Sequence, residues 1–196
     1  MSSTNTFDTR EAWLQRGAVL ITHTVFAAAG IEVPVVKTSC SWPGGGSARK
    51  RIGECWAKRM SEAGVNEIFI SPVIADPVQA LDILTHELVH ASDDCASGHG
   101  GEFVRRARKV GLEGKPTATV AGAALRAKLV EIADALGPYP HATLNLSGRK
   151  KQTTRMIKVE CGDCDGVFRT TQKWLDEATH GLCCPFCHGD NVQVGG

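Results

Sequence analysis

Leucines recur with a helical period near the middle of the chain. Leu81, Leu84 and Leu88 are spaced by three and four residues, which places them on one face of an amphipathic helix. Asp76 can cap the free N–H groups at the start of this helix, and Pro77 suits its first position. The sequence therefore predicts a helix that begins at residue 77 and buries its leucine face.

The same reading predicts three more helices. Residues 8–30 form the first, with Asp8 as its cap and a glycine at its end. Residues 101–110 form the next. A later helix runs from about residue 119 to residue 136 and has its own apolar stripe, and a Gly-Pro dipeptide stops it.

Short β-like runs precede the central helix, at residues 33–39, 52–60 and 67–71. Cys40 and Cys55 lie in or beside the first two runs and could face each other as buried thiols. Three short strands that lead into a helix predict an α+β core with a small sheet beside that helix. With 196 residues, 42% of them hydrophobic, the chain can bury one core and has room for a small accessory module.

Two histidines fall on the side of the central helix away from the leucines, with a glutamate beside them. His86-Glu87-Leu88-Val89-His90 matches the pattern H-E-x-x-H. Residues four apart lie one turn apart, so both imidazoles can bind one zinc ion while the glutamate takes the proton of an attacking water. Together with the predicted sheet, this motif indicates a zincin-like metallopeptidase core.

A third histidine follows in a glycine-rich loop. His99 is flanked by Gly98, Gly100 and Gly101, which permit the positive φ angles needed to turn the chain back toward the metal. The same loop holds three other potential ligands: Asp93, Asp94 and Cys95. The aspartates are close to the helix end, and hydrolytic zinc sites favour histidine or carboxylate over thiolate. We therefore expect a catalytic zinc ion bound by His86, His90 and His99, with Glu87 as the general base.

Four cysteines near the C-terminus have the spacing of a structural zinc site. Cys161-Gly162-Asp163-Cys164 and Cys184-Pro185-Phe186-Cys187 are two C-x-x-C pairs with nineteen residues between them. This spacing predicts a zinc ribbon held by Cys161, Cys164, Cys184 and Cys187. A module of this size has little core, so the metal would supply most of its folding free energy. Alternative ligands in the module are Cys183, His180 and His188.

Two segments carry a resemblance to a known family. His86-Glu87-Leu88-Val89-His90-Ala91, followed by Gly98-His99-Gly100-Gly101-Glu102-Phe103, resembles the SprT-like family of zinc metallopeptidases, to which the DNA–protein crosslink protease Spartan belongs. The strand-like run 66–72 and the four-cysteine module resemble that family too. The resemblance covers residues 52–110 and 161–187, whereas residues 112–150 match no motif. It implies protein substrates near DNA.

The expected domains are a metallopeptidase domain with an additional helix (1–140), a basic linker (141–158) and a Cys₄ zinc ribbon (159–196). A net charge of +1 means that any nucleic-acid binding must use a local patch. Residues 145–158 contain no acid and hold five basic residues: Arg149, Lys150, Lys151, Arg155 and Lys158. Such a run is either a solvated linker or a strip that contacts DNA phosphates.

The N-terminus shows no basic region followed by an apolar run, and no apolar stretch is long enough to cross a membrane. Without a secretory signal, eight cysteines that include two C-x-x-C pairs favour metal binding over disulfides. We therefore expect an intracellular, cytoplasmic protein with one catalytic and one structural Zn²⁺ and no membrane partner.

Two classes of function fit these features. The first is a zinc-dependent endopeptidase that hydrolyses peptide bonds in proteins, with Tyr139 or His141 as candidates to stabilise the oxyanion. The alternative is a nucleic-acid- or transcription-complex-binding protein whose working part is the ribbon and whose H-E-x-x-H domain is not catalytic. Glu87 favours the enzyme, because a purely structural metal site has no use for a base beside an open position.

Overall fold

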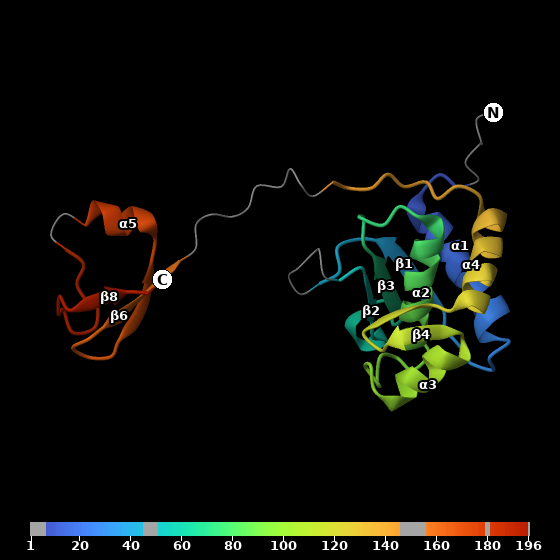
Figure 1. The fold of residues 1–196 in the computed structure, drawn as a ribbon, viewed down its shortest axis with the longest axis horizontal. Helices are drawn as coiled ribbons and strands as arrows, with labels where there is room; N and C mark the ends of the chain where they lie inside the picture. The colour runs from blue at the N-terminus through green and yellow to red at the C-terminus, as the bar shows by residue number, and fades with distance from the viewer. Residues whose placement is uncertain (1–6, 45–50, 146–155, 179–180, 196) are drawn as a thin grey trace. The chain divides into compact units, whose positions relative to one another are not determined.

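The computed structural model describes residues 7–44, 51–145, 156–178 and 181–195. The chain divides into two compact units, Met1–Asn145 and Leu146–Gly196 (Figure 1). We call them the N-terminal unit and the C-terminal unit. Both contain helices and small sheets, so the α+β prediction is confirmed. None of the helices in the described ranges is long and apolar enough to cross a membrane.

A three-stranded sheet forms one layer of the N-terminal unit. Its strands are β1 (Val36–Cys40), β2 (Gly53–Trp56) and β3 (Asn66–Ile70), in the order β1-β3-β2. β1 runs parallel to β3, and β2 runs antiparallel to it. Because β3 lies between the outer strands, Cys40 and Cys55 do not face each other as the sequence had suggested. The second predicted run also ends early, since a short 3-10 helix occupies Lys58–Met60.

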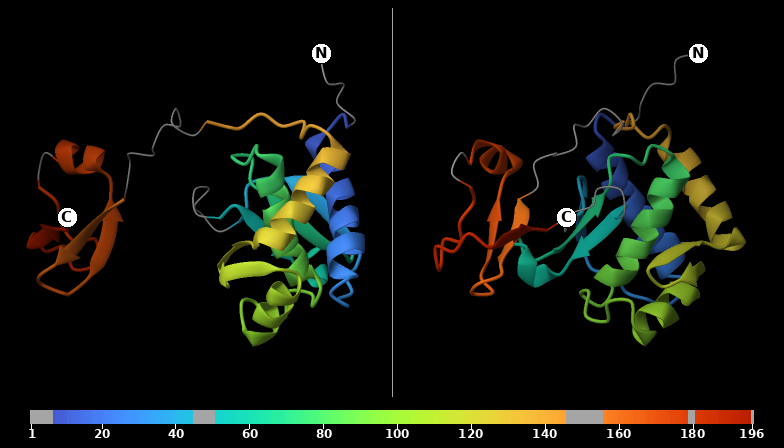
Figure 2. Two further views of the ribbon diagram at one scale, coloured as in Figure 1. Left: turned by 45° about the vertical axis from the view of Figure 1, so that its right-hand side comes forward. Right: turned by 60° about the vertical axis from the view of Figure 1, so that its left-hand side comes forward.

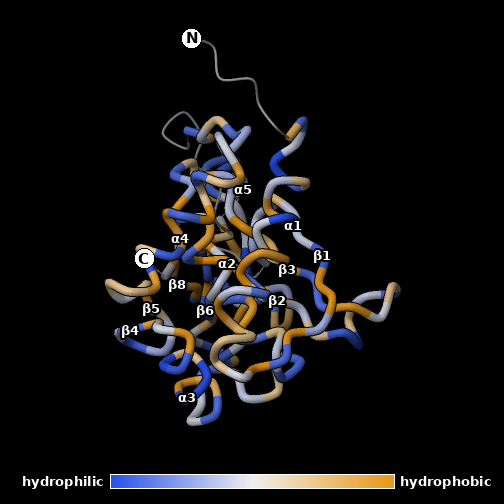
Figure 3. Tube along the Cα trace, turned by 90° about the vertical axis from the view of Figure 1, so that its right-hand side faces the viewer, coloured by the Kyte–Doolittle hydropathy of each residue, from blue (hydrophilic) through white to orange (hydrophobic). Residues whose placement is uncertain are grey.

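Helix α2 (Pro77–Ala91) is the central element of this unit. The Asp76 carboxylate accepts a hydrogen bond of 2.7 Å from the Gln79 N–H, which confirms the predicted cap. α2 packs against the sheet on one side and against α4 (Ala123–Leu136) and α1 (Arg10–Ile21) on the other (Figures 1 and 2). Hydrophobic and hydrophilic residues are interspersed along it (Figure 3), and its leucines are fully buried.

The first helix differs from its prediction at both ends. Its cap is Thr9 and not Asp8, because the Thr9 hydroxyl accepts a hydrogen bond from the Ala12 N–H. Beyond Ile21 the chain winds into a π-helix over Thr22–Phe26. Trp13 of α1 and Phe26 of the π-helix are fully buried, so both parts of this long segment contribute to the core.

A hairpin takes the place of part of one predicted helix. After α3 (Gly101–Lys109) come β4 (Leu112–Lys115) and β5 (Ala118–Ala121), which pair antiparallel. The helix predicted from residue 119 begins only at Ala123. Gly114 adopts φ +94°, Pro116 lies in the turn, and β-branched residues occupy β5, all of which favour a hairpin over a helix.

The C-terminal unit is a second small sheet with one short helix. Strands β6 (Ile157–Cys161), β7 (Val167–Thr170) and β8 (Val192–Val194) lie in the order β7-β6-β8, and α5 (Gln172–Glu177) follows β7. Among the described residues of this unit, the buried apolar side chains are Val159, Cys161 and Cys184. So small a core cannot hold a sheet of this kind without help.

Two candidate metal centres

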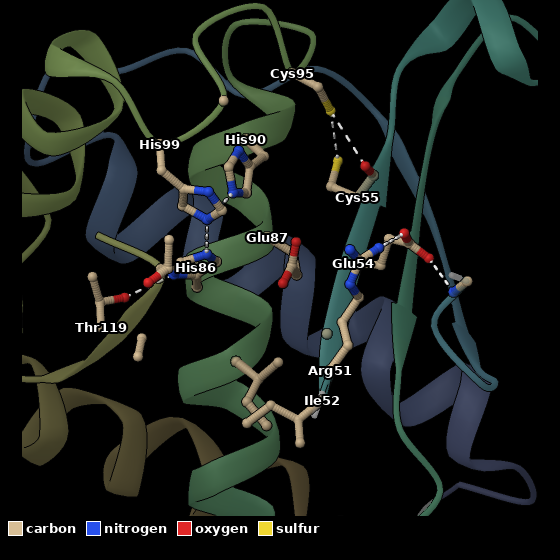
Figure 4. Close-up of a pocket in the computed structure, with 16 residues that line it drawn as sticks. Arg51, Ile52, Glu54, Cys55, His86, Glu87, His90, Cys95, His99 and Thr119 are labelled. Carbon is tan, nitrogen blue, oxygen red and sulfur yellow. Dashed lines mark hydrogen bonds and ion pairs between the residues drawn. The ribbon is translucent and has the colours of Figure 1, made fainter. Parts of the chain in front are cut away.

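Three imidazoles converge on one point in the N-terminal unit. His86 and His90 lie one turn apart on α2, and His99 comes from the loop before α3 (Figure 4). The Nε2 atoms of His90 and His99 are 3.2 Å apart, and those of His99 and His86 are 3.4 Å apart. Phe103 packs against all three rings and holds the cluster together. We call this cluster the histidine centre.

The spacing of these nitrogens suits a tetrahedral metal ion. Zinc–nitrogen bonds of about 2.0–2.1 Å in tetrahedral geometry separate neighbouring ligand atoms by about 3.3–3.4 Å, close to the separations observed. Burial and the neighbouring imidazoles lower the pKa of His86 to about 3 and that of His90 to about 4. Burial also lowers the pKa of His99. The imidazoles are therefore neutral at physiological pH, the form in which histidine binds metals.

Thr119 of the hairpin fixes the ring of His86. With Nε2 directed at the cluster, Nδ1–H donates a hydrogen bond of 2.7 Å to Thr119 Oγ1. Metal-binding histidines commonly have such a partner on the second nitrogen, because it sets the tautomer and the ring orientation. Sequence reading missed this residue, because it assigned residue 119 to a helix.

The loop between α2 and α3 brings His99 close to His86 and His90, whereas Asp93, Asp94 and Cys95 lie outside this group. Among the described residues, His86, His90 and His99 are the group in this region whose ligand atoms lie close enough to hold one ion. Asp94 is occupied elsewhere, since its carboxylate accepts hydrogen bonds from the Lys58 N–H and the Asn66 amide. Cys95 is directed at Cys55 of β2.

The turn itself is made differently from the prediction. Positive φ angles occur at Asp94, Cys95 and Gly98. Gly100 has φ −74° and caps α3, and Gly101 is the first residue of that helix. The positive φ predicted at Gly98 is therefore confirmed, whereas Asp94 and Cys95, and not Gly100 and Gly101, are the other residues in this conformation.

Glu87 lies in the same cavity as the histidine centre. This cavity has a volume of about 740 Å³ and is bounded by α2, by β2 and by the hairpin. Burial raises the pKa of Glu87 to about 8, with smaller contributions from Cys95 and Glu54. A carboxyl group in such surroundings can both accept and return a proton near neutral pH.

Gly53 lets strand β2 approach the Glu87 carboxylate. A Cβ atom at position 53 would lie 2.5 Å from Glu87 Oε1 and 2.5 Å from Ile83 Cγ2. Either distance is shorter than real Cβ contacts, so any larger residue would displace the glutamate or the strand. An isolated glycine at a strand start is the sequence signal for this close approach, but its partner could not be identified from sequence.

Charged side chains on β2 and just before it line the opposite wall of the cavity. Arg51 forms an ion pair with Glu54, whose other carboxylate oxygen accepts a hydrogen bond from the Gly44 N–H. Arg51 is close enough to lower the pKa values of Glu87 and His99 electrostatically, although burial dominates both shifts. The cavity therefore offers one cationic group across from the histidines (Figure 4).

The two predicted oxyanion residues lie elsewhere in the unit. Tyr139 is buried against Trp13, with ring centroids 4.6 Å apart. The His141 Nε2–H donates to the Pro72 carbonyl oxygen, and Nδ1 accepts from Arg10. Neither residue lines the cavity, so both serve the packing and anchoring of the chain after α4.

Four sulfur atoms converge in the C-terminal unit, and we call this cluster the cysteine centre. Among the described residues there, the group able to hold an ion is Cys161, Cys164, Cys184 and Cys187. The Sγ atoms of Cys161 and Cys187 are 3.6 Å apart, as are those of Cys164 and Cys184. Tetrahedral zinc with bonds of about 2.3 Å to sulfur places its ligands about 3.8 Å apart, so this set also fits.

Backbone N–H groups prepare one of these thiols for metal binding. Burial disfavours the Cys184 thiolate, but N–H groups of Cys187 and Phe186 oppose this effect and lower the pKa of Cys184 to about 7. Cys183 is exposed and lies outside the group, as does His188. His180, the other alternative ligand, lies outside the described residues.

The predicted phosphate-binding strip lies mostly beyond what the structure describes. Arg149, Lys150, Lys151 and Arg155 are outside the described residues. Lys158 is within strand β6 and forms an ion pair with Glu160, so it belongs to the sheet of the C-terminal unit.

Comparison of the chain with protein families, with curated proteins and with solved structures found no match.

Proposed function

We propose that this chain is a zinc-dependent endopeptidase with a zincin-like core. The observation that carries the proposal is that a buried carboxylate, Glu87, shares one cavity with three converging, neutral imidazoles. His86, His90 and His99 supply three ligands, the number found in hydrolytic zinc sites, which keep a further position open for substrate or water. A purely structural site would instead be closed, like the cysteine centre.

Each residue has a defined role in peptide hydrolysis. A zinc ion held by the three histidines would polarise the scissile carbonyl and increase the acidity of water. Glu87 takes a proton from the attacking water and returns it to the leaving amine. Thr119 keeps His86 in its ligating tautomer. Arg51 presents a positive charge on the opposite wall, where it can stabilise negative charge that develops on the substrate.

The shape of the cavity supports a polypeptide substrate. Residues 51–55 line one wall, and β2 forms an edge of its sheet, because it pairs with β3 on one side only among the described residues. An unpaired edge offers backbone N–H and C=O groups to an extended peptide, which can bind by adding a strand. Protein substrates associated with DNA are proposed on the resemblance to the SprT-like family alone.

A cleavage assay tests the proposal. Wild-type protein and Glu87→Gln should be compared on an unfolded protein substrate, with and without DNA, at matched zinc content. Loss of the carboxylate should reduce the rate on the order of 10²- to 10⁴-fold, whereas the exposed control Glu131→Gln should keep full activity. Cleavage that is zinc-dependent in the wild type and undiminished in Glu87→Gln would contradict the assignment of the base.

A further inference from the structure

Two cysteines lie side by side at the edge of the cavity, outside both metal centres. Cys55 is on strand β2, and Cys95 is in the loop between His90 and His99. Their Sγ atoms are 3.5 Å apart, and Cys95 Sγ is also 3.5 Å from the Cys55 carbonyl oxygen (Figure 4). Forty residues separate them in sequence, so only the tertiary fold brings them together.

The loop holds Cys95 in this position through several contacts. Cys95 adopts φ 61°, a conformation that is uncommon outside glycine, and its N–H donates to the His90 carbonyl oxygen. Asp94, also with positive φ, is anchored to Lys58 and Asn66 by hydrogen bonds of 2.7 and 2.8 Å. A strained conformation held by this many contacts indicates that the direction of the Cys95 side chain is determined by the fold.

The environment of the pair favours a reactive thiol. The two sulfurs are in hydrogen-bond contact, and Cys95 is the less buried of the two thiols. Both residues are partly exposed and line the cavity, which admits small molecules. Cys40 provides a contrast, since it faces Tyr139, and burial raises the pKa of its thiol. Accessible cysteines with a second thiol within reach are the ones that oxidants convert to a disulfide most readily.

We propose that Cys55 and Cys95 form a dithiol site that hydroperoxides oxidise to a disulfide. The Cys95 thiolate attacks one peroxide oxygen, so that an S–O bond forms and the O–O bond breaks. The departing oxygen takes up a proton and leaves as water or as an alcohol. The Cys55 sulfur then attacks the sulfenic acid, the S–O bond breaks, and the Cys55 proton leaves with the hydroxyl as water. Two thiols lose two electrons in total, and one hydroperoxide gains them.

The resulting bond would connect the strand that lines the cavity to the loop that carries His99. A disulfide requires an S–S distance of about 2.05 Å, so the two sulfurs must approach by about 1.5 Å from their present separation. Cys55 lies in the short strand β2 and Cys95 in the loop after α2, so this approach involves no helix of the core. The reduced and bridged forms are therefore two states of the same cavity wall.

Peptide mapping of the full-length, zinc-loaded protein tests the proposal without any cleavage assay. Trypsin places Cys40, Cys55 and Cys95 in separate peptides, residues 38–49, 52–58 and 60–105. After brief treatment with a small excess of hydrogen peroxide and alkylation, the peptides 52–58 and 60–105 should be recovered as one disulfide-linked species. A thiol reductant should separate them, and their thiols should be lost about tenfold faster than that of Cys40.

Single variants resolve the order of the two steps. Cys55→Ser should trap Cys95 as a sulfenic acid, detected as a dimedone adduct, whereas Cys95→Ser should leave Cys55 open to alkylation. Cys40→Ser is the matched control and should form the linked peptides as the wild type does. If the wild-type protein loses the Cys40 thiol as fast as the pair, or yields no linked peptides, the proposal is wrong. None of these readouts measures proteolysis, so they test the dithiol site independently of the proposed peptidase function.

Discussion

The two candidate metal centres differ in what holds their ligand side chains in place. The histidine centre is built on α2, which is enclosed by other helices and a sheet with many fully buried side chains. The cysteine centre is built on a small sheet whose described buried apolar residues are Val159 and two cysteines of that centre, Cys161 and Cys184. In one unit the fold positions the ligands, and in the other the ligands must hold the fold.

This difference explains why the two centres suit different roles. A preformed site can keep a coordination position open, because the protein core and not the metal maintains the geometry. A metal site that stabilises its own module contributes most folding free energy when four protein ligands fill the coordination sphere and no position is left open. In this protein, the centre with four candidate ligands is the one whose surrounding core can provide the least folding free energy.

The largest expected effect comes from removing the metal from each unit in turn. Cys161→Ser combined with Cys164→Ser should lower zinc content from two ions per chain to one, and the C-terminal unit should unfold. Structural zinc contributes roughly 10–16 kcal/mol in small modules, which that core cannot replace. His90→Ala should also remove one ion but leave the N-terminal unit folded.

Hydrogen exchange of backbone amides measures both outcomes. The double cysteine variant should lose protection in β6, β7 and β8 and keep it in α2 and β3. His90→Ala should keep its protection in the N-terminal unit. If it lost as much protection there as the double cysteine variant loses in the C-terminal unit, the metal would be holding both units together, and the proposed difference would be wrong.

A smaller effect is expected from Thr119→Val. The valine keeps the shape of the side chain and removes the oxygen that accepts the His86 hydrogen bond. Loss of such a partner lowers metal affinity 10- to 100-fold. Competition with a zinc chelator should show this loss at the histidine centre and no change at the cysteine centre. Thr119→Ser should restore the affinity, and a Thr119→Val protein with wild-type affinity would contradict the role of this residue.

The smallest effect concerns the pH dependence of the metal-free N-terminal unit. Burial raises the pKa of Glu87 from its ordinary 4.5 to about 8, so between pH 6.5 and 8 the unfolded chain has released a proton that the folded chain retains. The unfolded histidines still lose protons just above pH 6.5 and offset part of this effect. Stability should therefore fall as pH rises by roughly 1 kcal/mol, and at most ~2 kcal/mol, over this window. Below pH 6.5 the sign reverses, since His86 and His90 stay neutral when folded but take up protons when unfolded.

Denaturant unfolding at several pH values checks this expectation. Glu87→Gln has no carboxyl proton to lose, so its stability should not fall between pH 6.5 and 8. It should rise slightly as the unfolded histidines lose their protons. Parallel curves for the wild type and Glu87→Gln would show that Glu87 is not the buried titrating group. Bound zinc should abolish the slope, because a dication beside the carboxylate lowers its pKa.

Features set by short-range spacing were predictable from the sequence. The cap at Asp76, the helix with His86 and His90 one turn apart, and the two C-x-x-C pairs all depend on residues within a few positions of one another. His99 was also identified, because its distance from the helix and the glycines around it limited the choices. The structure brings these side chains together as expected.

Features that depend on distant segments were not predictable. Thr119 contacts His86 only because a hairpin replaces the first turn of a predicted helix. Gly53 matters because a separate helix brings Glu87 against it. The sequence allowed Cys55 to face Cys40, yet β3 lies between their strands, and the loop after α2 places Cys95 beside Cys55 instead. A single sequence does not specify strand order, so these juxtapositions required the structure.

The most direct test of this account is anomalous diffraction from crystals of the zinc-loaded protein at the zinc absorption edge. The account predicts two anomalous peaks in each chain. One should lie about 2.0–2.1 Å from Nε2 of His86, His90 and His99, with no fourth protein ligand, and the other about 2.3 Å from four cysteine sulfurs. A single peak at the cysteine centre, or a fourth protein ligand such as Cys95 closing the histidine centre, would contradict it.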